Sequence, residues 1–226
     1  MRFRASAFMH LLRAFALVAF SVASASAYAQ ASCASIVAPA ANFTGIVNGY
    51  YPGTSATASA GTSSIGVGAL DGRGALTAVA AGDLLLIIQM QDASFSSTNS
   101  AAYGGSGSGQ GYTALNSSGL FEYAVATGPV AAGSIPLASP LVNSYHSAAA
   151  NAVNGQKTYQ VIRVPQASSA TLTGTVTAPI WNGTTGGIVA IDVAGNLNWN
   201  GQSIDVDGRG FRGGGGQGST SDATGA

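Results

Sequence analysis

The chain has few charged residues and a single cysteine. Only 7% of its 226 residues are charged, whereas globular domains usually have about 25%. Because Cys33 is the sole cysteine, no disulfide can form within the chain. Disorder usually combines low hydrophobicity with high net charge, but this chain is 46% hydrophobic and has eight acidic against eight basic residues. The composition therefore predicts a folded protein without a disulfide framework.

The first 29 residues have the composition of a cleavable secretory signal. Three arginines flank or precede the apolar stretch 14–22, which is too short to span a bilayer. Small residues then place the expected cleavage between Ala29 and Gln30. The sequence therefore predicts export to the extracellular space or the cell surface. No later segment is apolar for long enough to cross a membrane, so no transmembrane segment is expected.

Two further expectations concern retention and partners. A lipid on Cys33 is an alternative to free release, but Gln30 and Ser32 occupy positions where a lipoprotein signal has aliphatic and small residues. Signal removal takes away three of the eight basic residues, which leaves five against eight acidic ones and a net charge of −3. No basic stripe remains, so a nucleic-acid partner is not expected.

The pattern of the mature chain favours an all-β fold. Helical periodicity with caps is nearly absent, and short β-branched runs alternate with residues that favour turns. We expect a β-sandwich or irregular β domain that leads into short-stranded, β-solenoid-like coils and ends in a glycine-rich stretch. The expected boundaries are 1–29 for the signal, 30–178 for the β domain, 179–212 for the solenoid-like segment and 213–226 for a flexible tail.

Three runs predict the main strands of the β domain. Residues 84–90 are apolar on both faces, which indicates a central strand covered on both sides. Residues 120–125 and 159–164 alternate in part, and Pro165 ends the last run because it cannot donate to a strand ladder. The Ser- and Gly-rich segment 94–118 is expected to be a mobile surface loop, in which two tyrosines, Tyr103 and Tyr112, are candidates for a contact surface.

The C-terminal third predicts a regular succession of short strands and turns. Strands are expected at 188–193, 197–199 and 203–206. Asn200-Gly201 and Asp207-Gly208 lie between or after them and suit the positive φ angles of tight turns. Such short strands cannot bury a face alone, but they can if each coil covers the next, as in a solenoid.

Several phrases of the chain together resemble the N-terminal regions of large secreted or surface proteins of Gram-negative bacteria. The resemblance covers about residues 42 to 216 and implies glycine-rich β segments at the outer envelope, with no chemistry assigned to any residue. The phrases that support it are Gly82–Asp92, Tyr159–Gln166, Ala178–Gly187, Val193–Gly201 and Gly208–Gly214.

One pair of carboxylates is a candidate metal site. Asp205 and Asp207 are two apart on a predicted strand and therefore share a face. Neighbouring carboxylates repel unless a cation or a proton lies between them, and Ca²⁺ prefers oxygen ligands. Calcium is thus the candidate cofactor, while an ordinary turn at Asp207-Gly208 is the alternative.

The function expected from these residues is that of a secreted or cell-surface structural or adhesive module without catalytic activity. One histidine in the mature chain, His146, excludes a His-cluster metal site, and no nucleophile motif accompanies it. Glycans or other cell-surface molecules are the expected partners. Trp181 and Trp199 suit either sugar stacking or strand packing.

The alternative function is that of a polysaccharide-active β-solenoid enzyme, a lyase or a glycosidase. Such enzymes arrange acidic and basic side chains along an open groove. The side chains available for this are Asp192, Asp205, Asp207, Arg209 and Arg212.

Overall fold

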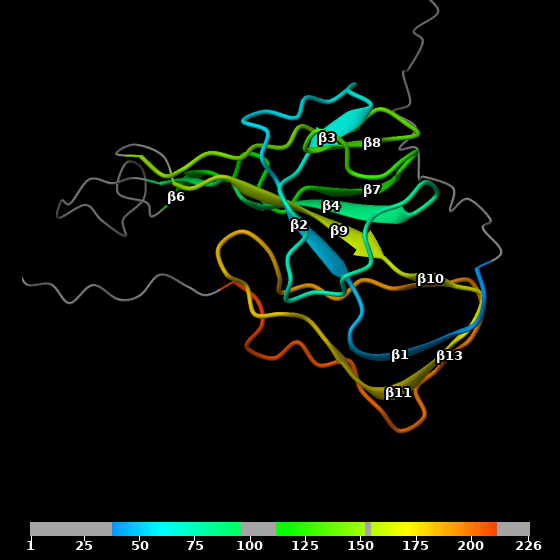
Figure 1. The fold of residues 1–226 in the computed structure, drawn as a ribbon. Helices are drawn as coiled ribbons and strands as arrows, with labels where there is room; N and C mark the ends of the chain where they lie inside the picture. The colour runs from blue at the N-terminus through cyan, green and yellow to red at the C-terminus, as the bar shows by residue number, and fades with distance from the viewer. Residues whose placement is uncertain (1–37, 96–111, 152–154, 212–226) are drawn as a thin grey trace, which may run out of the picture. The chain divides into compact units, whose positions relative to one another are not determined.

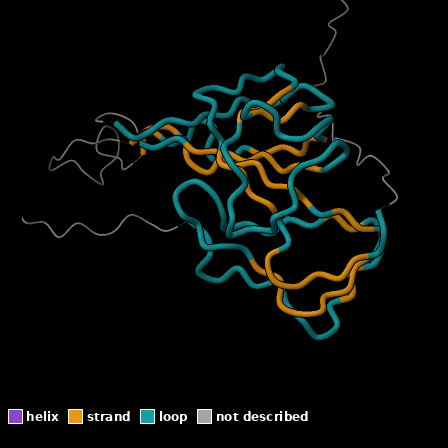
Figure 2. The backbone as a smooth tube through the Cα atoms, viewed as in Figure 1, coloured by secondary structure: helices purple, strands orange, loops and turns teal. Residues whose placement is uncertain are grey.

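The computed structural model describes residues 38–95, 112–151 and 155–211, all of them within one unit, Ala31–Ala226. The signal segment with its expected cleavage at Ala29 and Gln30, Tyr103, and the tail 213–226 lie outside the described residues. The described part is all-β and has no helix (Figures 1 and 2). Its strands are β1 Ala41–Ile46, β2 Gly49–Pro52, β3 Ser64–Gly66, β4 Leu84–Gln91, β5 Ser94–Phe95, β6 Tyr112–Ala114, β7 Phe121–Val125, β8 Ser134–Pro136, β9 Thr158–Val164, β10 Gln166–Ala167, β11 Ala170–Thr177, β12 Asp192–Val193 and β13 Leu197–Asn198.

An antiparallel sheet with the order β2-β9-β4-β7 forms the centre of the described part. Strand β4 is buried along most of its length because β7 and β9 flank it and apolar side chains cover both faces. The prediction of a doubly covered strand at 84–90 is confirmed. Strand β9 ends at Val164, directly before Pro165, as the missing N–H of proline predicts.

Each face of this sheet has its own apolar core. One face packs on the β3–β8 pair and on the loops around it, with Tyr51, Leu85, Ile87, Tyr159 and Val161 pointing into that core. The alternate residues of the same strands point to the other face, as the two-residue period of a strand requires. That second core contains Tyr50, Leu84, Leu86, Ile162 and Val164, and partly buried Ile188 and Ala190 pack against it.

A second set of strands pairs in parallel rather than antiparallel. Strand β11 lies between β1 and β13, and β10 pairs with β12 (Figure 1). We call residues 166–191 the inner segment and residues 192–211 the outer segment, because the outer one follows the inner one in register. The offsets are 26 residues from Gln166 to Asp192, 27 from Ala170 to Leu197 and 28 from Val176 to Ile204. A third apolar core, around Phe43, Ala167, Ala170, Leu172 and Val176, fills the space beside these strands.

This pairing crosses the boundary expected at residue 179. Strands β1, β10 and β11 lie before that boundary, yet β10 and β11 pair with the strands that follow it. The parallel arrangement therefore includes β1 near the start of the described residues, and after the central sheet it continues with β10 at Gln166.

Two of the expected C-terminal strands are shorter in the structure. In place of a strand over 188–193, only Asp192–Val193 pairs in a ladder, and over 203–206 the structure has a single bridge at Ile204. The physical reason for the first of these lies in the backbone partners of Gly186, Ile188 and Ala190, which are the side chains of Gln160, Tyr50 and Asn48 and not a neighbouring strand. The turn at Asn200-Gly201 has positive φ at both residues, as expected.

The segment 94–118 begins with β5, which pairs with β6 at Tyr112–Ala114, and a turn follows at residues 116–119. The residues between β5 and β6, 96–111, lie outside the described part, so the prediction of a mobile loop stays a prediction there. Among the described residues, no helix is long and apolar enough to span a bilayer.

Candidate functional site

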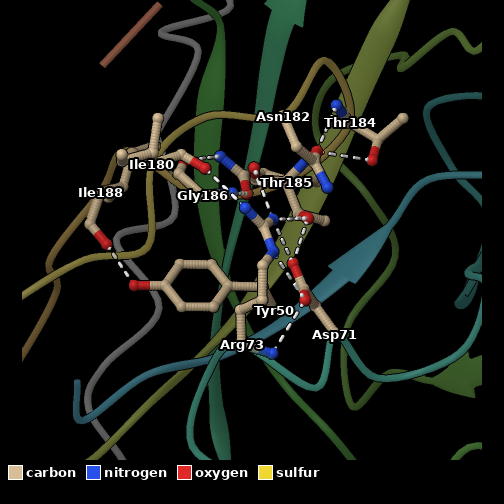
Figure 3. A network of polar contacts seen from close by, with 10 residues as sticks. Tyr50, Asp71, Arg73, Ile180, Asn182, Thr184, Thr185, Gly186 and Ile188 are labelled. Carbon is tan, nitrogen blue, oxygen red and sulfur yellow. Dashed lines mark hydrogen bonds and ion pairs between the residues drawn. The ribbon is translucent and has the colours of Figure 1, made fainter. Parts of the chain in front are cut away.

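The most connected polar network of the described residues joins the turn at Asp71-Gly72-Arg73 to the loop 179–187 (Figure 3). The Arg73 guanidinium donates to both carboxylate oxygens of Asp71, at 3.1 and 2.5 Å. It also donates to the carbonyl of Ile180 at 2.7 Å and to Thr185 Oγ1 at 3.2 Å. The Thr185 hydroxyl donates to Asp71 Oδ2 at 2.6 Å, which closes the ring of contacts.

This network shifts the pKa values of two groups. The hydrogen bond from Arg73 is the largest influence on Asp71 and lowers the pKa of its carboxyl from 3.8 to about 2, with a further contribution from Thr185 and with burial opposing them. Burial raises the pKa of the Tyr50 hydroxyl, and the negative charge of Asp71 adds to that rise. Tyr50 therefore remains a hydrogen-bond donor, and it donates to the carbonyl of Ile188 at 2.6 Å.

The contacts of this network connect the turn at residues 71–73 to loop 179–187, and they do not have the properties of a reaction centre. The donors and acceptors of Arg73 and Asp71 are directed at each other and at the loop backbone. A general acid or base needs a titratable atom that faces a substrate near its operating pH. A carboxyl with a pKa of about 2 stays charged and bound at any physiological pH. The arrangement therefore holds loop 179–187 against the sheet.

Three buried side-chain amides also bind loop backbone, one of them within the same loop 179–187. Gln160 on β9 donates to the carbonyl of Gly186 and accepts from its N–H, at 3.0 and 2.9 Å. Asn48 makes the same pair of contacts with Ala190, at 2.6 and 3.1 Å. Gln89 on β4 does so with His146, at 2.8 Å for each. An amide bonds both groups of one backbone residue, as a neighbouring strand does.

The sequence interpretation missed Asn48 and Gln89, and for Gln160 it left open whether the side chain faces solvent or a neighbouring layer. Gln89 and Gln160 interrupt apolar strands and are themselves fully buried. A polar residue at such a position is expected to be hydrogen-bonded, because burying an unpaired amide is unfavourable. That signal was present in the sequence, but the partner segments are 26 and 57 residues away along the chain.

The carboxylates outside this network are also bound individually. Asp83 pairs with Arg163 at 2.7 and 2.8 Å, and buried Asp92 pairs with Lys157 at 2.7 Å. Glu122 accepts from two backbone N–H groups, those of Val142 and Asn143. Each of these acids ties one loop or strand to another.

The structure places Asp205 and Asp207 on an exposed turn of the outer segment. The N–H of Asp207 donates to Asp205 Oδ1 at 2.9 Å, a contact typical of an Asx turn. Within the described ranges, no group of three or more His, Cys, Asp or Glu side chains is placed to hold a metal ion. The prediction that Asp205 and Asp207 bind calcium stays a prediction. Calorimetric titration with Ca²⁺ of the wild type and of an Asp205→Asn variant tests it.

The sequence Asp-Gly-Arg-Gly occurs twice, at residues 71–74 and 207–210. Both copies form turns, and both contact the loop 179–187. Arg73 of the first turn reaches it through its side chain. In the second turn, the carbonyl of Arg209 accepts from the N–H of Trp181 at 2.8 Å. A Cβ on Gly187 would come within 3.2 Å of Gly210. The similarity of the phrases thus reflects two turns that hold one loop from different chain positions.

His146 and the tryptophans have ordinary surroundings. The imidazole Nδ1 lies 3.3 Å from Thr57 Oγ1, and the His146 backbone is bound by Gln89. Trp181 is buried, which agrees with strand packing, whereas Trp199 is 51% exposed.

An exposed aromatic pair lies on β7, at the edge of the central sheet. Phe121 and Tyr123 are 56% and 46% exposed, and their ring centroids are 6.3 Å apart in an edge-to-face arrangement. They are opposite Ile88 and Leu86 of β4. The sequence interpretation did not single them out.

Comparison of the chain with protein-family models, curated proteins and solved structures finds no match in any of the three. The resemblance to Gram-negative surface proteins therefore stays an expectation.

Proposed function

We propose that this chain is an exported structural or adhesive module of the outer envelope of a Gram-negative bacterium, and that it has no catalytic activity. The main support is the use of its carboxylates. In the described residues, Asp83, Asp92 and Glu122 each bind a basic side chain or loop backbone on a different element. Asp71 binds Arg73 of its own turn and the Thr185 hydroxyl of loop 179–187. Acids used in this way stabilise loops, whereas an acid–base pair must converge on a substrate.

We also infer that the inner and outer segments are successive coils of a short parallel solenoid. The paired residues support this, because the offset between them rises by only one residue at a time, from 26 at Gln166 to 28 at Val176 along the inner segment. Trp181 and Arg209 continue the series with an offset of 28. Contacts at several successive points along two consecutive segments are the geometry in which each coil covers the next.

The alternative is a polysaccharide-active solenoid enzyme. It requires Asp192, Asp205 and Asp207 to act together on a substrate. Asp192 bonds to the backbone of Pro165, but Asp205 bonds to that of Val176. The strand between Ala170 and Val176 alone spans about 20 Å at 3.3 Å per residue, which favours the structural role.

Glycans are the proposed partners of the module. Phe121 and Tyr123 support this choice, because exposed aromatic faces at a sheet edge provide apolar contact area next to polar surface. Trp199 on the outer segment is a second exposed aromatic. The low charge of the chain suits neutral partners better than strongly charged ones.

The test uses the processed chain on a glycan array and on bacterial cells, with soluble polysaccharides assayed for cleavage. Retention on glycans or cells without product formation is the expected result. A Phe121→Ser/Tyr123→Ser variant is expected to lose at least tenfold in retention, and the exposed Leu76→Ser variant is the matched control. Polysaccharide cleavage that disappears in Asp205→Ala would overturn the proposal in favour of the enzyme.

Export has its own test. Expression of the full chain in a Gram-negative host, followed by fractionation and N-terminal sequencing, is expected to give an envelope or extracellular product that begins at Gln30. An unprocessed cytoplasmic product would contradict the proposed location.

A further inference from the structure

The outer segment ends the series of parallel strands in the described part of the chain. Strand β13 is the edge of the sheet β1-β11-β13, and β12 is the edge of the β10–β12 pair. Three apolar residues of the outer segment, Val193, Leu197 and Ile204, pack on the third core from this edge. Both the burial of these residues and the direction of their backbone groups differ from those expected at a sheet edge that is already covered.

Burial at equivalent positions shows what the edge lacks. Ala167 and Ala170 of the inner segment are 3% and 4% exposed, and Val176 is fully buried. Their register equivalents in the outer segment are Val193, Leu197 and Ile204, all larger, and all only partly buried. The outer segment covers the inner positions. The equivalent outer residues extend the same apolar core, but no described segment covers them to the same extent. Larger apolar side chains at a less covered layer favour a further apolar layer.

The backbone at these positions is directed the same way as the backbone one coil below. The carbonyl of Ala167 accepts from the N–H of Ala194, and the N–H groups of Ala170 and Val176 donate to the outer segment. In a parallel ladder, a residue whose two neighbours bond to one side directs its own N–H and C=O to the other side.

This rule applies to the outer segment itself. Asp192 and Ala194 bond to the inner segment on either side of Val193. Ser203 and Asp205 do so on either side of Ile204. Val193 and Ile204 therefore direct their N–H and C=O groups outward, away from the inner segment.

We propose that this edge is a strand-addition site, which binds an extended polypeptide strand of a partner in parallel register. The partner strand has apolar residues four and eleven positions after a first apolar residue, the spacing of Val193, Leu197 and Ile204. Main-chain hydrogen bonds to an open sheet edge provide the affinity, and the apolar positions provide the specificity. The existing contact between the inner and outer segments is the template for this interface.

The chain's own residues 212–226 do not have this pattern. Offsets of 26 and 27 would place Ser219 over Val193 and Thr224 over Leu197. Neither residue is apolar, so residues 212–226 do not fit the apolar spacing of this edge in that register. The inference depends on the register and the burial, and not on the proposed adhesive role.

The test titrates the processed full chain with a labelled synthetic peptide of residues 192–206, which contains the required spacing. Saturable binding is expected by fluorescence anisotropy. A peptide with serine at 193, 197 and 204 is expected to bind at least tenfold more weakly. A Leu197→Asp protein is expected to lose at least tenfold in affinity, and Leu76→Asp, at an exposed residue that is not part of the outer segment, to lose nothing.

A second pair of peptides tests the backbone register even if the Leu197→Asp protein fails to fold. N-methylation at Ala194 and Asp205 removes donors that bond to the underlying strand in the template, so at least a tenfold loss is expected. N-methylation at Val193 and Ile204 alters donors that point away, and little change is expected.

Several results would overturn the proposal. These are the absence of saturable binding up to about 1 mM, the weak end of specific association, and equal binding of the paired peptides. Self-association lost in Leu197→Asp would assign the edge to a second copy. A tenfold gain in peptide affinity after deletion of 212–226 would assign it to the tail. A failure here leaves the glycan and cleavage assays unaffected, so the two proposals are tested separately.

Discussion

Replacing Gln160 by leucine tests whether a buried amide, and not apolar packing alone, holds loop 179–187 on the sheet. Gln160 is fully buried and bonds both backbone groups of buried Gly186. Leucine has a similar size but leaves that N–H and C=O without their partner. Each unpaired buried polar group costs about 1 to 3 kcal/mol, and two groups lose their partner here. Because the leucine side chain regains part of this cost by apolar burial, we expect the free energy of unfolding to fall by about 2 to 4 kcal/mol.

A second substitution at the same position gives a pH signature. The carboxylate of Gln160→Glu can accept from the N–H of Gly186 but repels its carbonyl, and burial disfavours its charge. The pKa of this glutamic acid in the folded state is therefore raised. Because the protonated form can make both contacts, the variant should approach wild-type stability below about pH 4.3, the unfolded value, and lose it as pH rises through the folded pKa.

The assay is urea unfolding of the processed chain followed by tryptophan fluorescence, at pH 4 and pH 7. Each variant is compared with the wild type at the same pH, so that the titration of other groups cancels. The exposed Gln202→Leu variant is the matched control and is expected to change stability by less than about 0.5 kcal/mol. The reasoning is refuted if Gln160→Leu behaves like this control, or if the deficit of Gln160→Glu is the same at both pH values.

Three other outcomes follow from the same contacts. Asp71→Asn should cost about 1 to 2 kcal/mol at pH 7, a value reduced from the full pKa shift because Arg73 is 39% exposed. Because the pKa of Asp71 is lowered in the folded protein, the difference in free energy of unfolding between Asp71→Asn and wild type should persist above pH 3.8 and disappear as pH falls through about 2. Urea unfolding measures this difference, and a value that is constant with pH would contradict the expectation. Gly186→Ala should destabilise more than Gly183→Ala, because both have positive φ but only a Cβ on Gly186 would lie 2.7 Å from the Pro179 carbonyl; equal melting temperatures would exclude this clash. Phe121→Ser/Tyr123→Ser should unfold within about 1 kcal/mol of wild type, since both rings are half exposed, while glycan retention falls; loss of folding would show instead that the pair is structural.

The parallel pairing shows the limit of reading strands one at a time. The sequence predicts short strands after residue 187, and the glycine and asparagine turns between them have the expected φ angles. It does not predict that β1, more than 120 residues earlier, lies on the other side of β11. Such a pairing depends on side chains that meet only after the chain has folded, because register is set by a shared apolar core.

The sequence by itself determined the all-β class, the doubly buried strand at 84–90 and the end of a strand at Pro165. These follow from local patterns: side-chain alternation, continuous apolar runs and the missing N–H of proline. Only the tertiary structure decided that Asn48, Gln89 and Gln160 bind loops. It also decided that the acidic side chains lie apart and bind separate loops or strands. The physical reason is distance along the chain, since the partner of a buried polar group lies wherever folding brings an unpaired backbone group.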